Sequence, residues 1–133
     1  MPKGTPAITT TRSPPLARPW RRKTSKTVSA ALGLPPSQWS LSYQSRFGRE
    51  RWLEPSTLSE LDRLAAAGVR DVDVVCPGFA VDCIETLEEV ALGLVEHFRA
   101  QGGRLAYIPC LNDAPAHADA LALLARRAAG GEV

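Results

Sequence analysis

The chain has 133 residues, of which 44% are hydrophobic and 23% charged, and its formal net charge at pH 7 is +2. This length predicts one domain with a modest core, and the near-neutral charge balance gives no reason to expect nucleic acid or a membrane surface as the partner. No apolar run approaches the roughly 18 residues of a membrane-spanning helix, and the basic N-terminus lacks the apolar segment of a secretory signal. Three irregularly spaced cysteines argue against a disulfide framework and for a reducing compartment, so the cytoplasm is the predicted location.

The first 22 residues differ in composition from the rest of the chain. They hold five prolines, five Arg or Lys residues and no acid, and they show neither helical nor strand periodicity. We therefore expect residues 1–22 to be a disordered or loosely attached segment, and we expect the regular domain to span residues 23–133.

Three short runs after this segment are typical of strands, and four longer segments are typical of helices. The predicted strands are QWSLSYQ (38–44), VDVVC (72–76) and LAYIP (105–109). Capping residues, apolar stripes and terminal glycines predict helices over residues 24–32, 57–67, 82–100 and 115–127.

The resulting order, α-βα-βα-βα, predicts an α/β domain with a parallel sheet and flanking helices. Ligands of such sheets bind beyond the carboxyl ends of the strands. Three loops meet there, at residues 45–55, 77–81 and 110–115. Three strands form a small sheet with exposed edges, so the sequence indicates part of a domain.

The helix predicted over residues 82–100 carries an unusual number of carboxylates near its start. At 100° per residue its apolar side contains Ile84, Leu87, Ala91, Leu94, Val95 and Phe98. The opposite side contains Asp82, Glu85, Glu89, Gly93 and Glu96. Two interpretations stand side by side: a capping box of Asp82 with Glu85 on a solvated face, or a row of ligands for a divalent cation. Spacing alone favours capping.

Several motifs resemble those of ferrochelatase, which inserts ferrous iron into a porphyrin to make haem. They are YQSRFGRERWLEP (43–55), GVRDVDVVCPGFAVDCIETLEE (68–89) and YIPCLNDAP (107–115), preceded by a helix similar to KTSKTVSAALGL (23–34). They occur in the order and spacing of the family. The resemblance implies a chelatase-like (Rossmann-like) three-layer domain, present here as part of the C-terminal of two similar domains that enclose a porphyrin cleft.

The resemblance also implies roles for individual residues. Glu85 matches the acidic residue that faces a histidine across the cleft at the metal-insertion site, so it is the candidate metal ligand and catalytic group. Glu89 continues the acidic row that is proposed to conduct metal ions or protons. Trp52 matches an aromatic residue near the porphyrin, and Ser45 and Arg46 belong to the neighbouring loop.

The chain departs from the family pattern in ways that bear on activity. The partner histidine is absent, Gly93 interrupts the acidic row, and Leu123 stands where many relatives have an aspartate. We hypothesise a truncated product whose missing N-terminal domain is needed for activity. Porphyrin and ferrous iron are the expected substrates, and peripheral membrane contact is left open.

The three cysteines, Cys76, Cys83 and Cys110, fall near one sheet edge. An iron–sulfur cluster normally needs four ligands, so we interpret them as small apolar residues and expect no required cofactor. Two functions besides iron insertion stay open: a non-catalytic fragment that binds a partner or metal, and a sibling chelatase acting on another tetrapyrrole.

Overall fold

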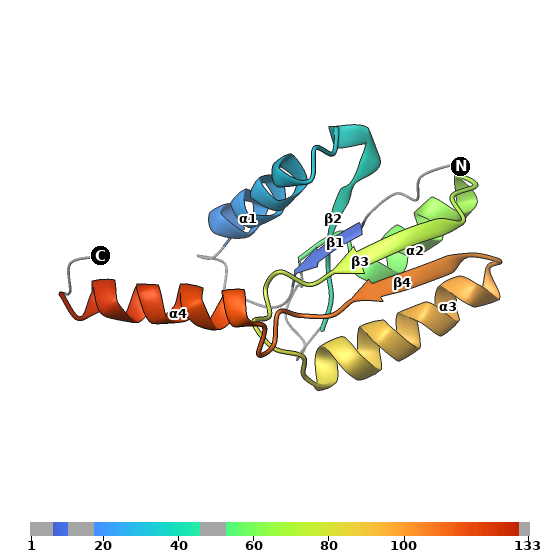
Figure 1. Cartoon of the computed structure of the whole chain (residues 1–133). Helices are drawn as coiled ribbons and strands as arrows, with labels where there is room; N and C mark the ends of the chain where they lie inside the picture. The colour runs from blue at the N-terminus through green and yellow to red at the C-terminus, as the bar shows by residue number, and fades with distance from the viewer. Residues whose placement is uncertain (1–6, 11–17, 46–52, 131–133) are drawn as a thin grey trace.

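The computed structural model describes residues 7–10, 18–45 and 53–130, with side chains from residue 23 onward. Its regular elements, in chain order, are β1 (Ala7–Thr10), α1 (Arg18–Ala31), the 3-10 turn η2 (Pro36–Gln38), β2 (Ser40–Tyr43), α2 (Thr57–Ala66), β3 (Asp71–Val75), the π-helix η3 (Glu85–Leu94), α3 (Val95–Ala100), β4 (Arg104–Ile108) and α4 (Pro115–Ala128) (Figure 1).

The four strands form one parallel sheet in the order β2-β1-β3-β4. Ile8 in β1 pairs with Leu41 on one side and with Val75 on the other. The β3–β4 pairing runs from Asp71 opposite Arg104 to Val75 opposite Ile108. In the view of Figure 1, α1 and α3 lie on either side of the strands. The predicted α/β class, a parallel sheet with flanking helices, is therefore confirmed.

Strand β1 corrects the prediction for the N-terminal segment. Ala7–Thr10 falls in the stretch expected to be disordered or loosely attached, whereas it lies inside the sheet, and α1 begins at Arg18 rather than near residue 24. Four residues are too few to show an alternating pattern, and the surrounding prolines and basic residues masked the β-branched Ile-Thr-Thr run.

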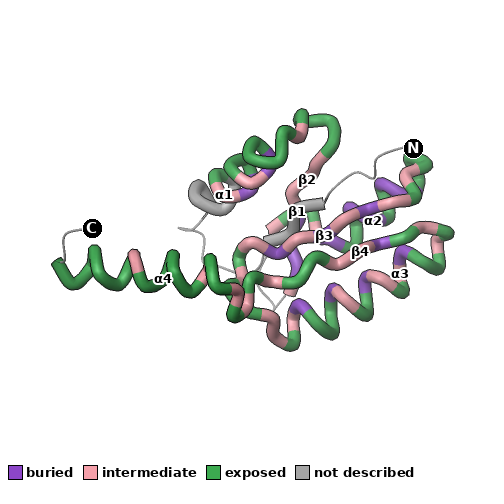
Figure 2. Tube along the Cα trace, in the orientation of Figure 1, coloured by how far each residue is buried: buried purple, intermediate pink, exposed green. Residues whose placement is uncertain are grey.

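The hydrophobic core fills one face of the sheet, between β3, α2 and the η3–α3 helix (Figure 2). Val72 and Val74 are fully buried, as the two-residue period of a strand requires. The core consists of Leu61, Leu64, Ala65, Val72, Val74, Cys76, Val90, Leu94, Phe98 and Leu105. The Phe98 ring covers Gly103 so closely that a Cβ there would lie 2.3 Å from a ring carbon, which is why the turn into β4 needs a residue without a side chain.

The helix after β3 differs from the predicted one in its pitch. Residues Glu85–Leu94 are π-helical, and α-helical geometry follows only from Val95. The buried positions are Thr86, Val90, Leu94 and Phe98, four residues apart, because a π-turn contains more residues than an α-turn. Ile84 and Leu87, predicted for the apolar side of this helix, are 64% and 49% exposed, so they do not belong to its buried face.

Helix α4 extends away from the sheet (Figure 1), and none of its residues is buried. It exposes Leu121 and Leu124. Neither α4 nor any other helix in the described part of the chain has the length and apolar character needed to cross a membrane.

Candidate functional site

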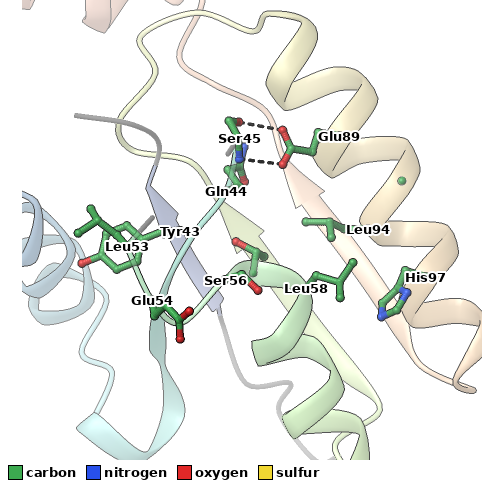
Figure 3. A pocket seen from close by; sticks show the side chains of 12 residues that line it. Tyr43, Gln44, Ser45, Leu53, Glu54, Ser56, Leu58, Glu89, Leu94 and His97 are labelled. Atoms are coloured by element: carbon green, nitrogen blue, oxygen red, sulfur yellow. Dashed lines mark hydrogen bonds between the residues drawn. The ribbon is translucent and has the colours of Figure 1, made fainter. Parts of the chain in front are cut away.

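The carboxyl end of β2 meets the π-helix through a direct contact between Ser45 and Glu89. The Ser45 backbone N–H donates to Glu89 Oε1 at 2.8 Å, and the Ser45 hydroxyl donates to Glu89 Oε2 at 2.8 Å (Figure 3). Both carboxylate oxygens are thus engaged by one residue 44 positions earlier in the chain. Ser45 has φ +60°, a left-handed conformation that is uncommon for serine and that turns both donors towards the helix.

This contact lies on the wall of a pocket of about 540 Å³. The end of β2, the start of α2 and the η3–α3 helix supply its lining, which is Tyr43, Gln44, Ser45, Leu53, Glu54, Ser56, Thr57, Leu58, Glu89, Gly93, Leu94 and His97. Gln44 is 4% exposed. Its Oε1 faces the Cys76 thiol at 3.8 Å, while its Nε2 has no hydrogen-bond partner among the described residues. A buried donor without a partner is rare in native proteins, and this one belongs to a residue of the pocket lining.

Glu85 occupies the first position of the π-helix, one turn before Glu89. Its side chain is only partly covered. Hydrogen bonds from the Cys83 thiol and from its own backbone N–H hold the pKa of Glu85 below its usual value. The side chain is therefore a carboxylate at neutral pH that remains accessible from the carboxyl edge of the sheet.

Asp82 has a different environment from the other acids of the predicted row. Its Oδ1 accepts a 2.5 Å hydrogen bond from the Tyr107 hydroxyl and a 3.0 Å bond from Thr86 Oγ1, while its Oδ2 accepts from Asn112 Nδ2 at 2.8 Å. These bonds, that of Tyr107 foremost, hold the pKa of Asp82 far below its usual value. Burial and the same contact raise the pKa of Tyr107 well above that of an exposed tyrosine. The capping box predicted for Asp82 and Glu85 is therefore wrong, because the Asp82 carboxylate accepts a hydrogen bond from the Thr86 hydroxyl and makes no bond with Glu85.

The acidic row continues to a histidine rather than to a further acid. Four-residue spacing along the helix aligns Glu85, Glu89, Gly93 and His97, and the last three of these line the pocket. Glu96, predicted for this row, falls off that spacing. His97 Nε2 lies 2.6 Å from Asp62 Oδ1, which also accepts from Gln101 at 2.8 Å. Hydrogen bonds from His97 and then Gln101 hold the pKa of Asp62 below its usual value.

Three of the predicted site residues can be placed, and two cannot. Ser45 and Glu89 are in contact at the predicted sheet edge, and Glu85 lies one turn before Glu89 on the helix, outside the lining of the pocket. Arg46 and Trp52 lie outside the described residues. Within the described ranges, no three His, Cys, Asp or Glu side chains gather closely enough to hold a metal ion by themselves.

Sequence reasoning missed several polar groups at this edge, chiefly Gln44, Tyr107 and Asn112. Tyr107 lies in a predicted strand and Asn112 in a predicted edge loop, so their positions could be found. Their convergence on Asp82 could not be found, because contacts over 25 and 30 residues leave no periodic signal.

The described elements define an α/β domain built on a four-stranded parallel sheet with flanking helices. A crystal structure of a CbiX protein assigned to cobalamin (vitamin B12) biosynthesis, from Marinobacter aquaeolei VT8, superposes with a TM-score of 0.61 at 17% identity and covers 93% of both chains. At this identity the match concerns the fold alone.

The chain belongs to the ferrochelatase family. The family model Ferrochelatase matches residues 18–129. The chain is 60% identical over 101 residues to a ferrochelatase of Xylella fastidiosa (strain M12), covering 76% of this chain and 32% of the relative. It is 57% identical over 106 residues to a ferrochelatase of Xanthomonas axonopodis pv. citri (strain 306), covering 80% and 33%. The chain thus spans about a third of the length of the curated relatives that it matches.

Proposed function

We propose that this chain contributes to the insertion of ferrous iron into protoporphyrin, the reaction that forms haem, as part of a two-domain ferrochelatase. In this proposal residues 18–129, which the family model matches, correspond to part of the C-terminal domain. The observation that carries the proposal is the pair of accessible carboxylates, Glu85 and Glu89, aligned one turn apart at the carboxyl edge of the sheet. Family membership supplies the reaction class that such a pair would serve.

In this reaction two pyrrole N–H bonds break, two protons leave, and the metal binds the nitrogen atoms that they vacate. Ionised carboxylates serve both halves of this exchange, because they bind a divalent cation and accept protons. Glu85 would position the ion and accept a proton. Glu89 would pass a proton or ion along the row while the two Ser45 donors fix its orientation.

The surroundings of Glu85 also suit a flat apolar substrate. Val81, Ile84 and Leu111 are 55%, 64% and 62% exposed. Their two loops are joined, because the Asn112 backbone N–H donates to the Ala80 carbonyl at 3.0 Å. An exposed apolar rim beside a carboxylate offers van der Waals contact to a macrocycle and polar contact to its centre. Trp52 and Arg46 remain predicted contacts to the ring and to its propionates.

The rest of the site would come from the N-terminal domain, which in this proposal supplies the partner histidine. The cytoplasm remains the predicted location, and peripheral membrane contact is not assigned. Non-catalytic binding of a partner or a metal stays the second candidate.

The test is a metal-insertion assay with ferrous iron and zinc on the purified chain, alone and together with the N-terminal part of a ferrochelatase relative. We expect insertion only in the mixture. Glu85→Gln, which keeps the shape but removes the charge, should lower the rate by at least about a hundredfold, the lower end of what a general base contributes.

Glu96→Gln is the matched control, because it makes the same change further along the same helix, in its α-helical part and off the four-residue row of Glu85 and Glu89, and it should leave the rate unchanged. Equal rates for the two glutamine variants would contradict the roles given to this row. A mixture with no activity would favour the non-catalytic fragment.

A further inference from the structure

We propose that Asp82 is a positioning residue for Glu85: held by Tyr107 and Asn112, it fixes the backbone on both sides of Glu85 and so presents that carboxylate at the sheet edge. This inference rests on the function proposed above. It assigns a supporting role to a side chain that the sequence pattern placed among the cation ligands.

The first argument is that the hydrogen bonds of Asp82 reach separate segments of the fold. Tyr107 reaches it from β4, and Cys110 and Asn112 reach it from the loop between β4 and α4. Asn112 closes a ring of two bonds, since its Oδ1 also accepts from the Asp82 backbone N–H at 2.8 Å. Asp82 thereby ties the β3–η3 loop to the neighbouring strand and loop.

The second argument concerns the residues that flank Glu85. Thr86 is fully buried, and its Oγ1 contacts Asp82 Oδ1 at 3.0 Å and accepts from the Cys83 backbone N–H at 3.0 Å. Residues 82 and 83 before Glu85 and residue 86 after it are therefore held by one network. The Glu85 side chain itself stays partly exposed, so a rigid backbone carries an accessible carboxylate.

The third argument separates positioning from ligation. Asp82 Oδ1 faces three donors and Oδ2 a fourth, so both oxygens are already engaged. None of the ion pairs in the described part of the chain includes Asp82, so its charge is compensated by hydrogen bonds. A cation could bind Asp82 only by breaking bonds that hold the loops together. The hydrogen bonds to Glu85 come from its own segment, so a cation that displaces them leaves the contacts between the loops in place.

The experiment is a titration with Co²⁺ of the full chain mixed with the N-terminal part of a ferrochelatase relative. The absorption of the bound ion reports affinity and coordination geometry together. Tyr107→Phe removes one donor and keeps the ring. Asn112→Asp keeps the acceptor for the Asp82 N–H and suits the left-handed φ of +48° at this position, but it sets a carboxylate oxygen against Asp82 Oδ2. Removal of such supporting groups typically weakens metal binding about 10-fold or more, and we expect that loss, with a changed spectrum, in both variants.

Two reference variants make the outcomes distinct. Glu85→Gln should abolish binding. Asp71→Asn removes the 2.7 Å ion pair with Arg104 at the opposite end of the same two strands, and binding should stay unchanged even where thermal stability falls.

Absence of Co²⁺ binding in the mixture that contains the unmodified chain, or binding there that survives Glu85→Gln, would overturn the proposed function and this inference together. Binding lost in Glu85→Gln but unchanged in Tyr107→Phe and Asn112→Asp would overturn the positioning role alone. Tighter binding in Tyr107→Phe would also overturn it, because a freed Asp82 oxygen would then be acting as a ligand.

Discussion

The two long helical segments that follow β3 and β4 differ in how far they pack against the rest of the fold. The η3–α3 helix buries Thr86, Val90, Leu94 and Phe98 against the sheet, and polar bonds hold its start. Helix α4 follows β4 directly, yet none of its residues is buried. The comparison shows that a helix does not pack against the core merely because it follows a strand. It packs there when side chains at a regular spacing place one of its faces on the sheet.

The largest effect should come from Phe98→Ala. The Phe98 ring is fully buried and covers Gly103, so its removal leaves a cavity between α3 and the start of β4. We expect the free energy of unfolding to fall by about 3–5 kcal/mol, as for other buried aromatic truncations. Urea denaturation followed by circular dichroism measures this change. A loss below about 1 kcal/mol would show that this helix is not secured through its core face.

An intermediate, pH-dependent effect is expected from Asp82→Asn. The folded-state pKa of Asp82 lies below its unfolded value, so the ionised group stabilises the fold above the unfolded pKa, and this contribution is lost as the pH falls through about 4 and below. The variant should be less stable at pH 7 and should lose less stability between pH 5 and pH 3.

Denaturation midpoints at pH 7, 5 and 3 test this expectation. Asp119→Asn, on exposed α4, is the control and should follow the unmodified chain at every pH. Parallel pH curves for Asp82→Asn and the unmodified chain would mean that the network at the start of η3 contributes nothing to acid sensitivity.

The smallest effect should come from Leu124→Ala. Leu124 is 60% exposed on a helix without buried residues, so the free energy of unfolding should change by no more than about 0.5 kcal/mol. The same urea experiment measures it. A loss as large as that of Phe98→Ala would show that α4 is packed in solution, and the contrast between the two helices would disappear.

Much of this arrangement could be predicted from local patterns. Alternating residues located β2, a run of β-branched residues located β3, and a short apolar run ending at a proline located β4, each within one or two positions. The chain order of strands and helices located the edge where Ser45 and Glu89 meet. The resemblance of residues 68–89 to one family directed attention to Glu85 in particular.

Other features could not be predicted because they depend on the assembled sheet. Strand β1 is too short to leave a pattern, and pairing with both neighbours defines it. The π-helical pitch shifts the buried face from Ile84 and Leu87 to Thr86 and Val90, which a fixed 100° rotation does not anticipate. The hydrogen bonds of Asp82 join segments that only the folded chain brings together.

Strand β1 has a consequence for the order of assembly. It occupies an interior place in the sheet, flanked by strands that start some 30 and 60 residues later in the chain. Long-range pairing of this kind slows folding, because distant segments must meet before any ladder can close. Deleting the first ten residues would remove β1 and leave β2 without a pairing strand beside the remaining β3–β4 pair. The four residues of β1 therefore join the two parts of the sheet.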